Sequence, residues 1–291
     1  MKREESSMNH GSGEHAGHTG HTGHTGHTTA LPGGLQVSQD GYTLDLKTPR
    51  ITACEEAPLR FAIRDDSGKA VTDYTTVHGK DLHLILASRD LNTFRHVHPA
   101  LGPEGTWSIP VNLPTAGDYR VLADFAPARQ GAKAMTLGAD LAVAGSYQPR
   151  DLPAAKPTAE VDGYTVTLDG ELTPGTMSEL KLSVAKDGKP VTDLEPYLGA
   201  YGHLVALRSG DLAYLHVHPE GEPGDATTKP GPEISFMATA PSHGTYRLFL
   251  DFQHEGTVRT AAFTVHASAH ASSADTDART AGGNRSGAGH H

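Results

Sequence analysis

The stretch "GHLVALRSGDLAYLHVHP" (residues 202–219) has a close counterpart upstream, "LHLILASRDLNTFRHVHP" (residues 82–99). Each copy contains two short apolar segments around a polar turn, the pattern of a β-hairpin. Each copy also ends in His-Val-His followed by proline. Side chains two positions apart on a strand share a face, so the two terminal histidines of each copy are expected to be neighbours.

The duplication extends beyond the hairpin. "DGYTLDL" (40–46) matches "DGYTVTL" (162–168), and "PTAGDYRVLADF" (114–125) matches "PSHGTYRLFLDF" (241–252). The hairpins are offset by 120 residues and the last pair by 127. The extra residues fall in a Pro/Gly-rich stretch of the second copy, where a surface loop tolerates insertion.

The composition favours β-structure. Glycine (33) and proline (19) are frequent, helical periodicity is scarce, and short strand-like segments alternate with turn signals. Each block has about the length of one immunoglobulin-like β-sandwich. The sequence therefore predicts an all-β chain with two tandem immunoglobulin-like sandwiches. The expected divisions are a disordered His-rich tail (1–31), the first repeat (32–146), a Pro-rich linker (147–158), the second repeat (159–267) and a disordered polar tail (268–291).

Charge and cysteine content exclude several classes of protein. The net charge of −10 argues against nucleic-acid binding, which needs a basic face. No apolar run is long enough for a membrane span. The single cysteine, Cys54, rules out an intramolecular disulfide or a thiolate metal cluster within one chain. The chain starts without an apolar signal-peptide core, so a cytoplasmic location is one expectation and a missed upstream export signal is the other.

The 19 histidines are the most informative residues. If His83 lies directly opposite His96, and His203 directly opposite His216, three imidazoles converge on one face of each hairpin. A slip of one residue would send His83 or His203 to the other face. Three neutral imidazoles suit Cu(II) or Zn(II). The predicted ligands are His83, His96 and His98 in the first repeat, and His203, His216 and His218 in the second.

Other side chains are weaker candidates. The N-terminal tract can chelate divalent metals without distorting a fold, because its histidines recur every third residue. Asp124 and Asp251 occupy equivalent positions and are expected to be structural rather than ligands. The weaker candidates are His15, His18, His21, His24, His27, His78, Asp124, His243, Asp251 and His254. Paired histidines before a proline can also be ordinary packing features of a half-exposed strand, and the tract can be a solvated tail.

Catalysis is not expected. No Ser/His/Asp order, paired carboxylates or phosphate-binding glycine loop stands out, and no organic cofactor is implied. A three-histidine site with an open position could activate water, which leaves a hydrolytic metalloenzyme as the third-ranked hypothesis.

The segment "APSHGTYRLFLDFQHEGTVRTAAFTV" (240–265) resembles the YtkA-like family of small extracytoplasmic β-sandwich domains. Residues 32–267 as a whole resemble actinobacterial secreted proteins with two such repeats and a His-rich N-terminal stretch. The resemblance implies an extracytoplasmic location, secreted or in the cell envelope, and a heavy-metal or copper context.

The leading hypothesis is a non-enzymatic metal-binding protein of the cell envelope that sequesters, buffers or delivers copper or another divalent ion. An envelope protein could receive the metal. The competing hypothesis is an immunoglobulin-like protein-interaction module whose histidines are structural or pH-responsive.

Overall fold

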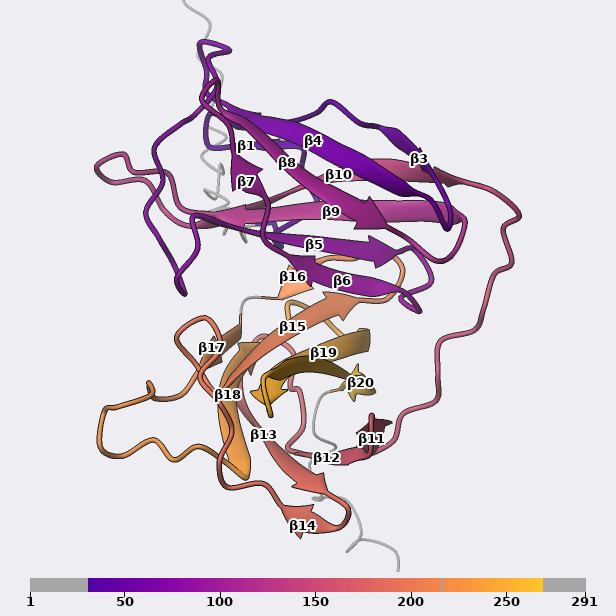
Figure 1. Cartoon of the computed structure of the whole chain (residues 1–291), viewed down its shortest axis with the longest axis vertical. Helices are drawn as coiled ribbons and strands as arrows, with labels where there is room; N and C mark the ends of the chain where they lie inside the picture. Colours follow the sequence, from indigo (N-terminus) through magenta and orange to yellow (C-terminus); the bar gives the residue numbers. More distant parts are fainter. Residues whose placement is uncertain (1–30, 216, 269–291) are drawn as a thin grey trace, which may run out of the picture. The chain divides into compact units, whose positions relative to one another are not determined.

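The computed structural model describes residues 31–215 and 217–268, without the side chain of His218. The predictions for the two tails concern residues outside this part of the chain, apart from Leu31 and Ser268 at its ends. The described residues form strands, turns and loops and no helix (Figure 1). Accordingly, they include no helix of the length and apolarity needed to cross a bilayer.

The first repeat contains two five-stranded sheets, with the orders β1-β2-β4-β8-β7 and β3-β10-β9-β5-β6. All neighbouring strands are antiparallel except β3, which runs parallel to β10. The strands are β1 (Ser38–Gln39), β2 (Tyr42–Leu46), β3 (Arg50–Thr52), β4 (Glu56–Arg64), β5 (Leu82–Ser88), β6 (Phe94–Val97), β7 (Ala100–Leu101), β8 (Thr106–Asn112), β9 (Gly117–Phe125) and β10 (Met135–Ala144).

The second repeat contains a sheet of order β11-β12-β13-β18-β17, with β14 beside β13, and a sheet of order β16-β15-β19-β20. Its strands are β11 (Thr158–Val161), β12 (Tyr164–Asp169), β13 (Met177–Lys186), β14 (Lys189–Pro190), β15 (Gly202–Arg208), β16 (Tyr214–Leu215), β17 (Val217–Pro219), β18 (Glu233–Thr239), β19 (Gly244–His254) and β20 (Thr257–Ala267).

This strand order defines an immunoglobulin-like sandwich. That fold places strands A, B, E and D in one sheet and strands G, F and C in the other. In the first repeat these are β2, β4, β8 and β7, and then β10, β9 and β5; in the second they are β12, β13, β18 and β17, and then β20, β19 and β15. Each repeat has its own buried apolar core. The prediction of two tandem immunoglobulin-like sandwiches is confirmed.

A tyrosine at the start of the F strand fixes the same corner in both repeats. The Tyr119 hydroxyl donates to the carbonyl oxygen of Thr115 at 2.9 Å, and the Tyr246 hydroxyl donates to that of Ser242 at 2.8 Å. Both rings are buried. This backward hydrogen bond is the tyrosine corner of immunoglobulin-like domains. The shared "YR" of the two matching segments is therefore a structural signature.

The β5 strand is buried along its whole length, and β15 is buried at all but its last residue. Leu84 and Leu86 of β5 belong to the core of the first repeat, whereas the alternating Ile85 and Ala87 belong to a separate cluster that includes residues of the second repeat. That cluster consists of Ile85, Ala87, Leu91, Phe94, Leu122, Val205, Leu207, Leu212 and Phe249. The outer face of β5 is therefore buried against the second repeat, and the histidine His83 lies on this face.

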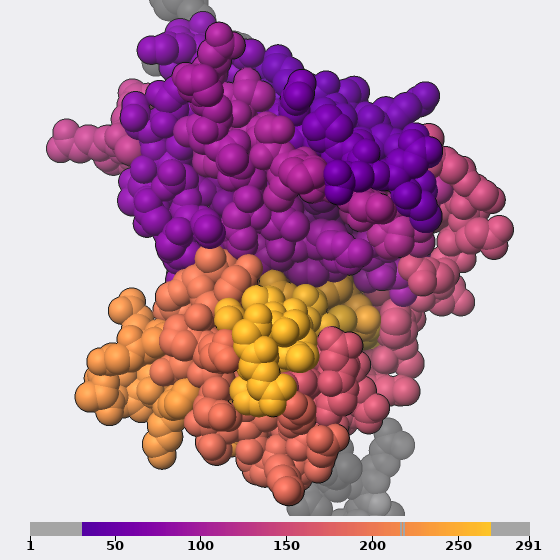
Figure 2. Space-filling view, in the orientation of Figure 1, coloured from indigo at the N-terminus to yellow at the C-terminus, as the bar shows by residue number. Residues whose placement is uncertain are grey.

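The additional residues of the second repeat lie in the connection from β17 to β18. This segment, residues 220–232, is mostly exposed and forms a surface loop, orange in Figure 2. The insertion therefore leaves the sheets of the second repeat intact.

Replacing Tyr246 by phenylalanine should lower the free energy of unfolding of the second repeat by about 1–2 kcal/mol, because the Ser242 carbonyl loses its buried partner. Urea unfolding followed by fluorescence and circular dichroism measures this change. Tyr147→Phe is the control, since this side chain is 53% exposed. An unchanged midpoint for Tyr246→Phe would contradict the role of the corner.

Candidate metal centre

The hairpin of β5 and β6 brings three histidines together. In its ladder His96 lies opposite Ile85, so the predicted direct opposition of His83 and His96 is wrong by two residues. A shift of two preserves the face on which a side chain lies, because side chains alternate with a period of two. The predicted convergence of His83, His96 and His98 therefore occurs despite the different register.

The ligand nitrogens of these three rings all lie within 4.8 Å of one another. The Nδ1 atom of His83 is 3.1 Å from Nε2 of His96 and 3.1 Å from Nε2 of His98. Metal–nitrogen bonds of about 2.0–2.1 Å place the nitrogens of a tetrahedral site about 3.3 Å apart. The two separations of 3.1 Å from His83 Nδ1 are close to this value, and the third separation lies within 4.8 Å.

A backbone carbonyl determines the tautomer of His83. Its Nε2 lies 3.0 Å from the carbonyl oxygen of Val77. A carbonyl can only accept, so Nε2 carries the hydrogen and Nδ1 of the neutral ring is unprotonated. Val77 is held by a tight turn, in which His78 and Gly79 both have positive φ and Val77 and Lys80 exchange backbone hydrogen bonds.

A carboxylate from the second repeat determines the tautomer of His96. Nδ1 of His96 donates to Oδ2 of Asp251 at 2.9 Å, and both side chains are about 95% buried. Oδ1 of Asp251 accepts a hydrogen bond from Thr260 at 2.5 Å. Because Nδ1 carries the hydrogen, Nε2 of the neutral His96 ring is unprotonated.

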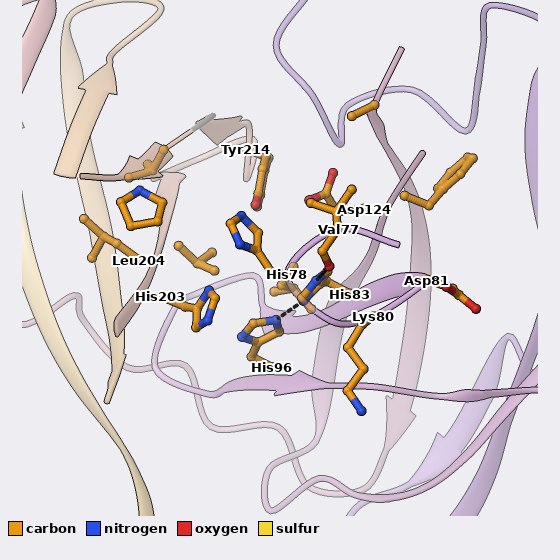
Figure 3. Close-up of a pocket in the computed structure, with 16 residues that line it drawn as sticks. Val77, His78, Lys80, Asp81, His83, His96, Asp124, His203, Leu204 and Tyr214 are labelled. Atoms are coloured by element: carbon orange, nitrogen blue, oxygen red, sulfur yellow. Dashed lines mark hydrogen bonds between the residues drawn. The ribbon is translucent and has the colours of Figure 1, made fainter. Parts of the chain in front are cut away.

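The unprotonated nitrogens of His83 and His96 therefore face each other at 3.1 Å (Figure 3). Two lone pairs at this separation repel each other, and neither neutral ring has a hydrogen to place between them. A cation that accepts both lone pairs removes the repulsion. A histidine whose other nitrogen is held by a carboxylate or carbonyl is the usual arrangement of a metal ligand.

Burial favours the neutral form of His83, His98 and His203. Burial lowers the pKa of His83 to about 4 and that of His98 to about 3, and neighbouring imidazoles act in the same direction. Burial also lowers the pKa of His203 to about 4. Neutral imidazole is the form that binds a metal, so protons compete weakly for these nitrogens at neutral pH.

A cavity of about 230 Å³ adjoins His83 and His96 of the cluster. His83, His96, His78, His203 and Asp124 line its polar part, as Figure 3 shows. Apolar side chains of both repeats form the rest of the wall, including Ile85, Phe125, Leu204 and Val205. The cavity therefore connects the three-histidine cluster with the first histidine of the second repeat.

Asp124 occupies the position on β9 that Asp251 occupies on β19. Each lies opposite the first histidine of its repeat and accepts a hydrogen bond from a threonine, at 2.9 Å from Thr136 in the case of Asp124, but only Asp251 also bonds to a histidine among the described residues. Burial raises the pKa of Asp124 to about 6. Of the two aspartates among the weaker candidates, Asp251 is hydrogen-bonded to His96 of the cluster, and Asp124 lies in the cavity wall.

Of the second predicted trio, only His203 lies wholly within the described residues. The β15–β16 ladder pairs Ala206 with Leu215, which is the register of the first hairpin. His216 and the side chain of His218 lie outside the described residues. The backbone of His218 belongs to β17 and pairs with Met237 in the sheet opposite to β15.

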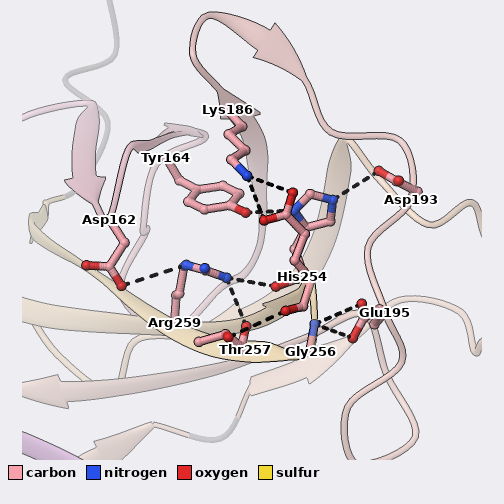
Figure 4. Close-up of polar contacts among 10 residues, drawn as sticks. Asp162, Tyr164, Lys186, Asp193, Glu195, His254, Gly256, Thr257 and Arg259 are labelled. Carbon is pink, nitrogen blue, oxygen red and sulfur yellow. Dashed lines mark hydrogen bonds and ion pairs between the residues drawn. The ribbon is translucent and has the colours of Figure 1, made fainter.

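His254 and His243 lie away from the cluster. His254 is buried in the second repeat, where Nδ1 is 2.7 Å from the Tyr164 hydroxyl and Nε2 is 3.2 Å from Asp193 (Figure 4). His243 is exposed on the turn before β19. The tail histidines His15, His18, His21, His24 and His27 lie outside the described residues.

Sequence reasoning did not identify the groups that orient the histidines. These are the carbonyls of Val77 and Tyr197, the carboxylate of Asp251 as a partner of His96, and Thr260 behind it. The repeated aspartate of "YRVLADF" and "YRLFLDF" was a usable signal for Asp251. Backbone carbonyls leave no signal in a sequence.

The fold and the cluster define a tandem immunoglobulin-like protein with an internal histidine centre. The chain belongs to the family described as domain of unknown function DUF8832, whose model matches twice, at residues 36–143 and 159–269. The double match agrees with the internal duplication. A search of the curated proteins found no significant match.

Several solved structures are similar at low identity. The Escherichia coli adhesin FdeC is 13% identical over 79% of this chain and 65% of its own, with a TM-score of 0.26. Invasin, a bacterial integrin-binding protein, is 12% identical over 78% of this chain and 39% of its own, with a TM-score of 0.24. A putative membrane-anchored protein of Corynebacterium diphtheriae is 10% identical over 78% of this chain and 57% of its own, with a TM-score of 0.24. The chain thus spans less than two thirds of the length of each of these three structures. The fold assignment rests on the order of the strands in the sheets.

Chelator-treated protein should lose stability as the pH falls from 7 to 5. In the unfolded chain histidines titrate near 6.5, whereas the folded-state pKa values of His83, His98 and His203 are about 4, 3 and 4. The unfolded state therefore binds more protons, and the stability that is complete above pH 6.5 is lost as the pH falls towards 4. Asp124 opposes this trend because its pKa is raised to about 6.

The three histidines lower the stability more than the one carboxyl raises it. We therefore expect the free energy of unfolding to fall by about 2–4 kcal/mol between pH 7 and pH 5, measured by urea unfolding at pH 7, 6 and 5. His83→Gln should reduce the slope, and His243→Gln should not. Stability that is constant or rises on acidification would contradict the burial of neutral imidazoles.

Proposed function

We propose that this protein is a non-enzymatic metal-binding protein of the cell envelope that sequesters, buffers or delivers Cu(II) or Zn(II). The observation that carries this proposal is the pair of unprotonated nitrogens on His83 and His96, 3.1 Å apart, whose tautomers are determined by Val77 and Asp251. A metal ion between the two nitrogens would accept both lone pairs and remove their repulsion.

The set of donor atoms indicates the class of metal. Imidazole nitrogen is a ligand for copper, zinc, nickel and iron, whereas magnesium and calcium require oxygen ligands. His98 supplies a third nitrogen, also 3.1 Å from Nδ1 of His83. Three imidazoles plus one further position satisfy the four-coordinate preference of zinc and are also suitable for Cu(II).

The arrangement favours storage or transfer over catalysis. The three histidines are buried or half-buried, and a turn and a carboxylate hold two of the rings. The N-terminal histidine tract supports a role in metal capture, since histidines repeated at every third position can chelate divalent ions. The resemblance to YtkA-like extracytoplasmic domains supports a location outside the cytoplasm.

A protein-interaction module is the alternative function. Immunoglobulin-like sandwiches occur in many cell-surface domains, so the fold is compatible with this role. In that case the histidines would be packing groups, and the chain would bind metal only through its tail.

Cu(II) and Zn(II) titration of the full chain tests the proposal. All histidines of residues 1–31 and 268–291 are first replaced by asparagine, which removes tail chelation. We expect binding with a Kd below micromolar, and a loss of at least 100-fold in the His83→Gln/His96→Gln variant, which lacks two ligand nitrogens. Isothermal titration against a competing chelator measures both values.

His243→Gln/His266→Gln is the matched control, because both histidines belong to the second repeat and neither lies at the cluster. If the parent chain binds neither metal at micromolar concentrations, the proposal fails and the interaction module is favoured.

Asp251→Asn should weaken metal binding by about 10–100-fold, as is usual when the carboxylate behind a ligand histidine is replaced. The amide keeps an acceptor for His96 but loses the charge that makes the ring a better donor. Asp124→Asn is the matched control, since it removes the equivalent carboxylate, which is hydrogen-bonded to Thr136 and to no histidine among the described residues. Equal effects of the two substitutions would contradict the specific role of Asp251.

A further inference from the structure

The three-histidine cluster is open on one side. Three ligands leave the fourth position of a tetrahedral ion vacant. The cavity beside the cluster is lined by His83 and His96 but not by His98, and on its other side it is lined by His203. The open side of the cluster therefore faces a histidine of the second repeat (Figure 3).

His203 is held in the manner of a ligand. Its Nε2 lies 2.7 Å from the carbonyl oxygen of Tyr197, so Nε2 carries the hydrogen and Nδ1 of the neutral ring is unprotonated. The residue is 7% exposed, and its Nδ1 has no hydrogen-bond partner among the described residues.

His203 and His83 are held by the same kind of hydrogen bond to a backbone carbonyl. Val77 and Tyr197 are offset by 120 residues, as are the two histidines, and each carbonyl accepts from Nε2 of its histidine. Each carbonyl begins a tight turn whose two ends exchange backbone hydrogen bonds. Both repeats thus present a first histidine with its Nδ1 unprotonated.

The ring positions show how far His203 is from the cluster. The ring centres of His83, His96 and His98 are 4.9–5.3 Å apart, close to the distance of about 5 Å expected for imidazoles around one tetrahedral ion. The centre of His203 is 6.5 Å from that of His83 and 6.4 Å from that of His96. His203 is not part of the group whose ligand atoms all lie within 4.8 Å of one another. Its ring centre would have to move by about 1 Å to reach the ligand spacing from His83 and His96.

We propose that His203 is the fourth ligand, so that one ion is bound jointly by both repeats. This inference rests on the proposed function and extends it to the coordination number and the stoichiometry. The ion has four nitrogen donors, from His83, His96, His98 and His203. Asp251 of the second repeat supports the ligand His96.

The shared ion makes the two hairpins unequal. His203 cannot complete the first cluster and also centre an equivalent cluster of its own. The backbone agrees with this division, since β17 pairs with β18 and does not continue the β15–β16 ladder. The expected stoichiometry is one ion per chain.

His78 is the competing fourth ligand. Its ring centre is 5.3 Å from that of His203 and 6.3 Å from that of His83. It is exposed, however, and lies in the turn at a position where the second repeat has Leu198. His78→Leu is therefore a natural control, because the equivalent turn already accepts leucine.

Electron paramagnetic resonance and pulsed measurements on Cu(II) count the nitrogen donors. The sample is the full chain with the tail histidines replaced by asparagine, loaded with one equivalent of Cu(II). We expect four imidazole nitrogens in this parent, three in His203→Gln and four in His78→Leu. The glutamine amide can still donate to the Tyr197 carbonyl, and thermal unfolding verifies that the variant is folded.

Titration gives the second readout. His203→Gln should bind Cu(II) about 10–100-fold more weakly than the parent, and saturation of the parent should occur at one ion per chain. An unchanged nitrogen count and affinity in His203→Gln, loss of a nitrogen in His78→Leu instead, or saturation of the parent at two ions would overturn the inference. Failure of the parent to bind any Cu(II) would instead overturn the proposed function, so the two failures are distinguishable.

Discussion

The hydrogen bond from His96 to Asp251 is the interaction on which the rest of the histidine centre depends. It joins a strand of the first repeat to a strand of the second across 155 residues of sequence, and both side chains are almost fully buried. It also determines which nitrogen of His96 carries the hydrogen. The same contact therefore connects the two repeats and turns the unprotonated nitrogen of His96 towards His83.

This contact is buried because the outer faces of the C strands, β5 and β15, pack in one cluster that joins the two repeats. Alternate residues of β5 enter the core of the first repeat, and the others meet the second repeat. The centre of that face is apolar, with Phe94 and Phe249 stacked at 4.0 Å, and the imidazoles lie beside the cavity. Burial favours the neutral form of His83, His98 and His203, so the packing that stabilises the repeats also prepares these nitrogens to bind a cation.

The sequence predicts the fold and part of the site. The His-x-His spacing fixes the face of His96 and His98, and any even register then places them beside His83. The actual register, two residues from the predicted one, depends on the turn between the strands and on packing, which the motif does not specify. The partnership of His96 with Asp251 was not predictable, because it arises from the packing of one repeat against the other and no local pattern encodes that arrangement.

Duplication offers a reason for the asymmetry of the centre. When two copies of a domain meet through equivalent faces, residues near the approximate twofold axis meet their own counterparts. His83 and His203 are such a pair, with ring centres 6.5 Å apart. An ion near this axis can be bound by both, but the two hairpins cannot then retain separate complete clusters. The first copy then supplies three ligands, and the second supplies one ligand and a supporting carboxylate.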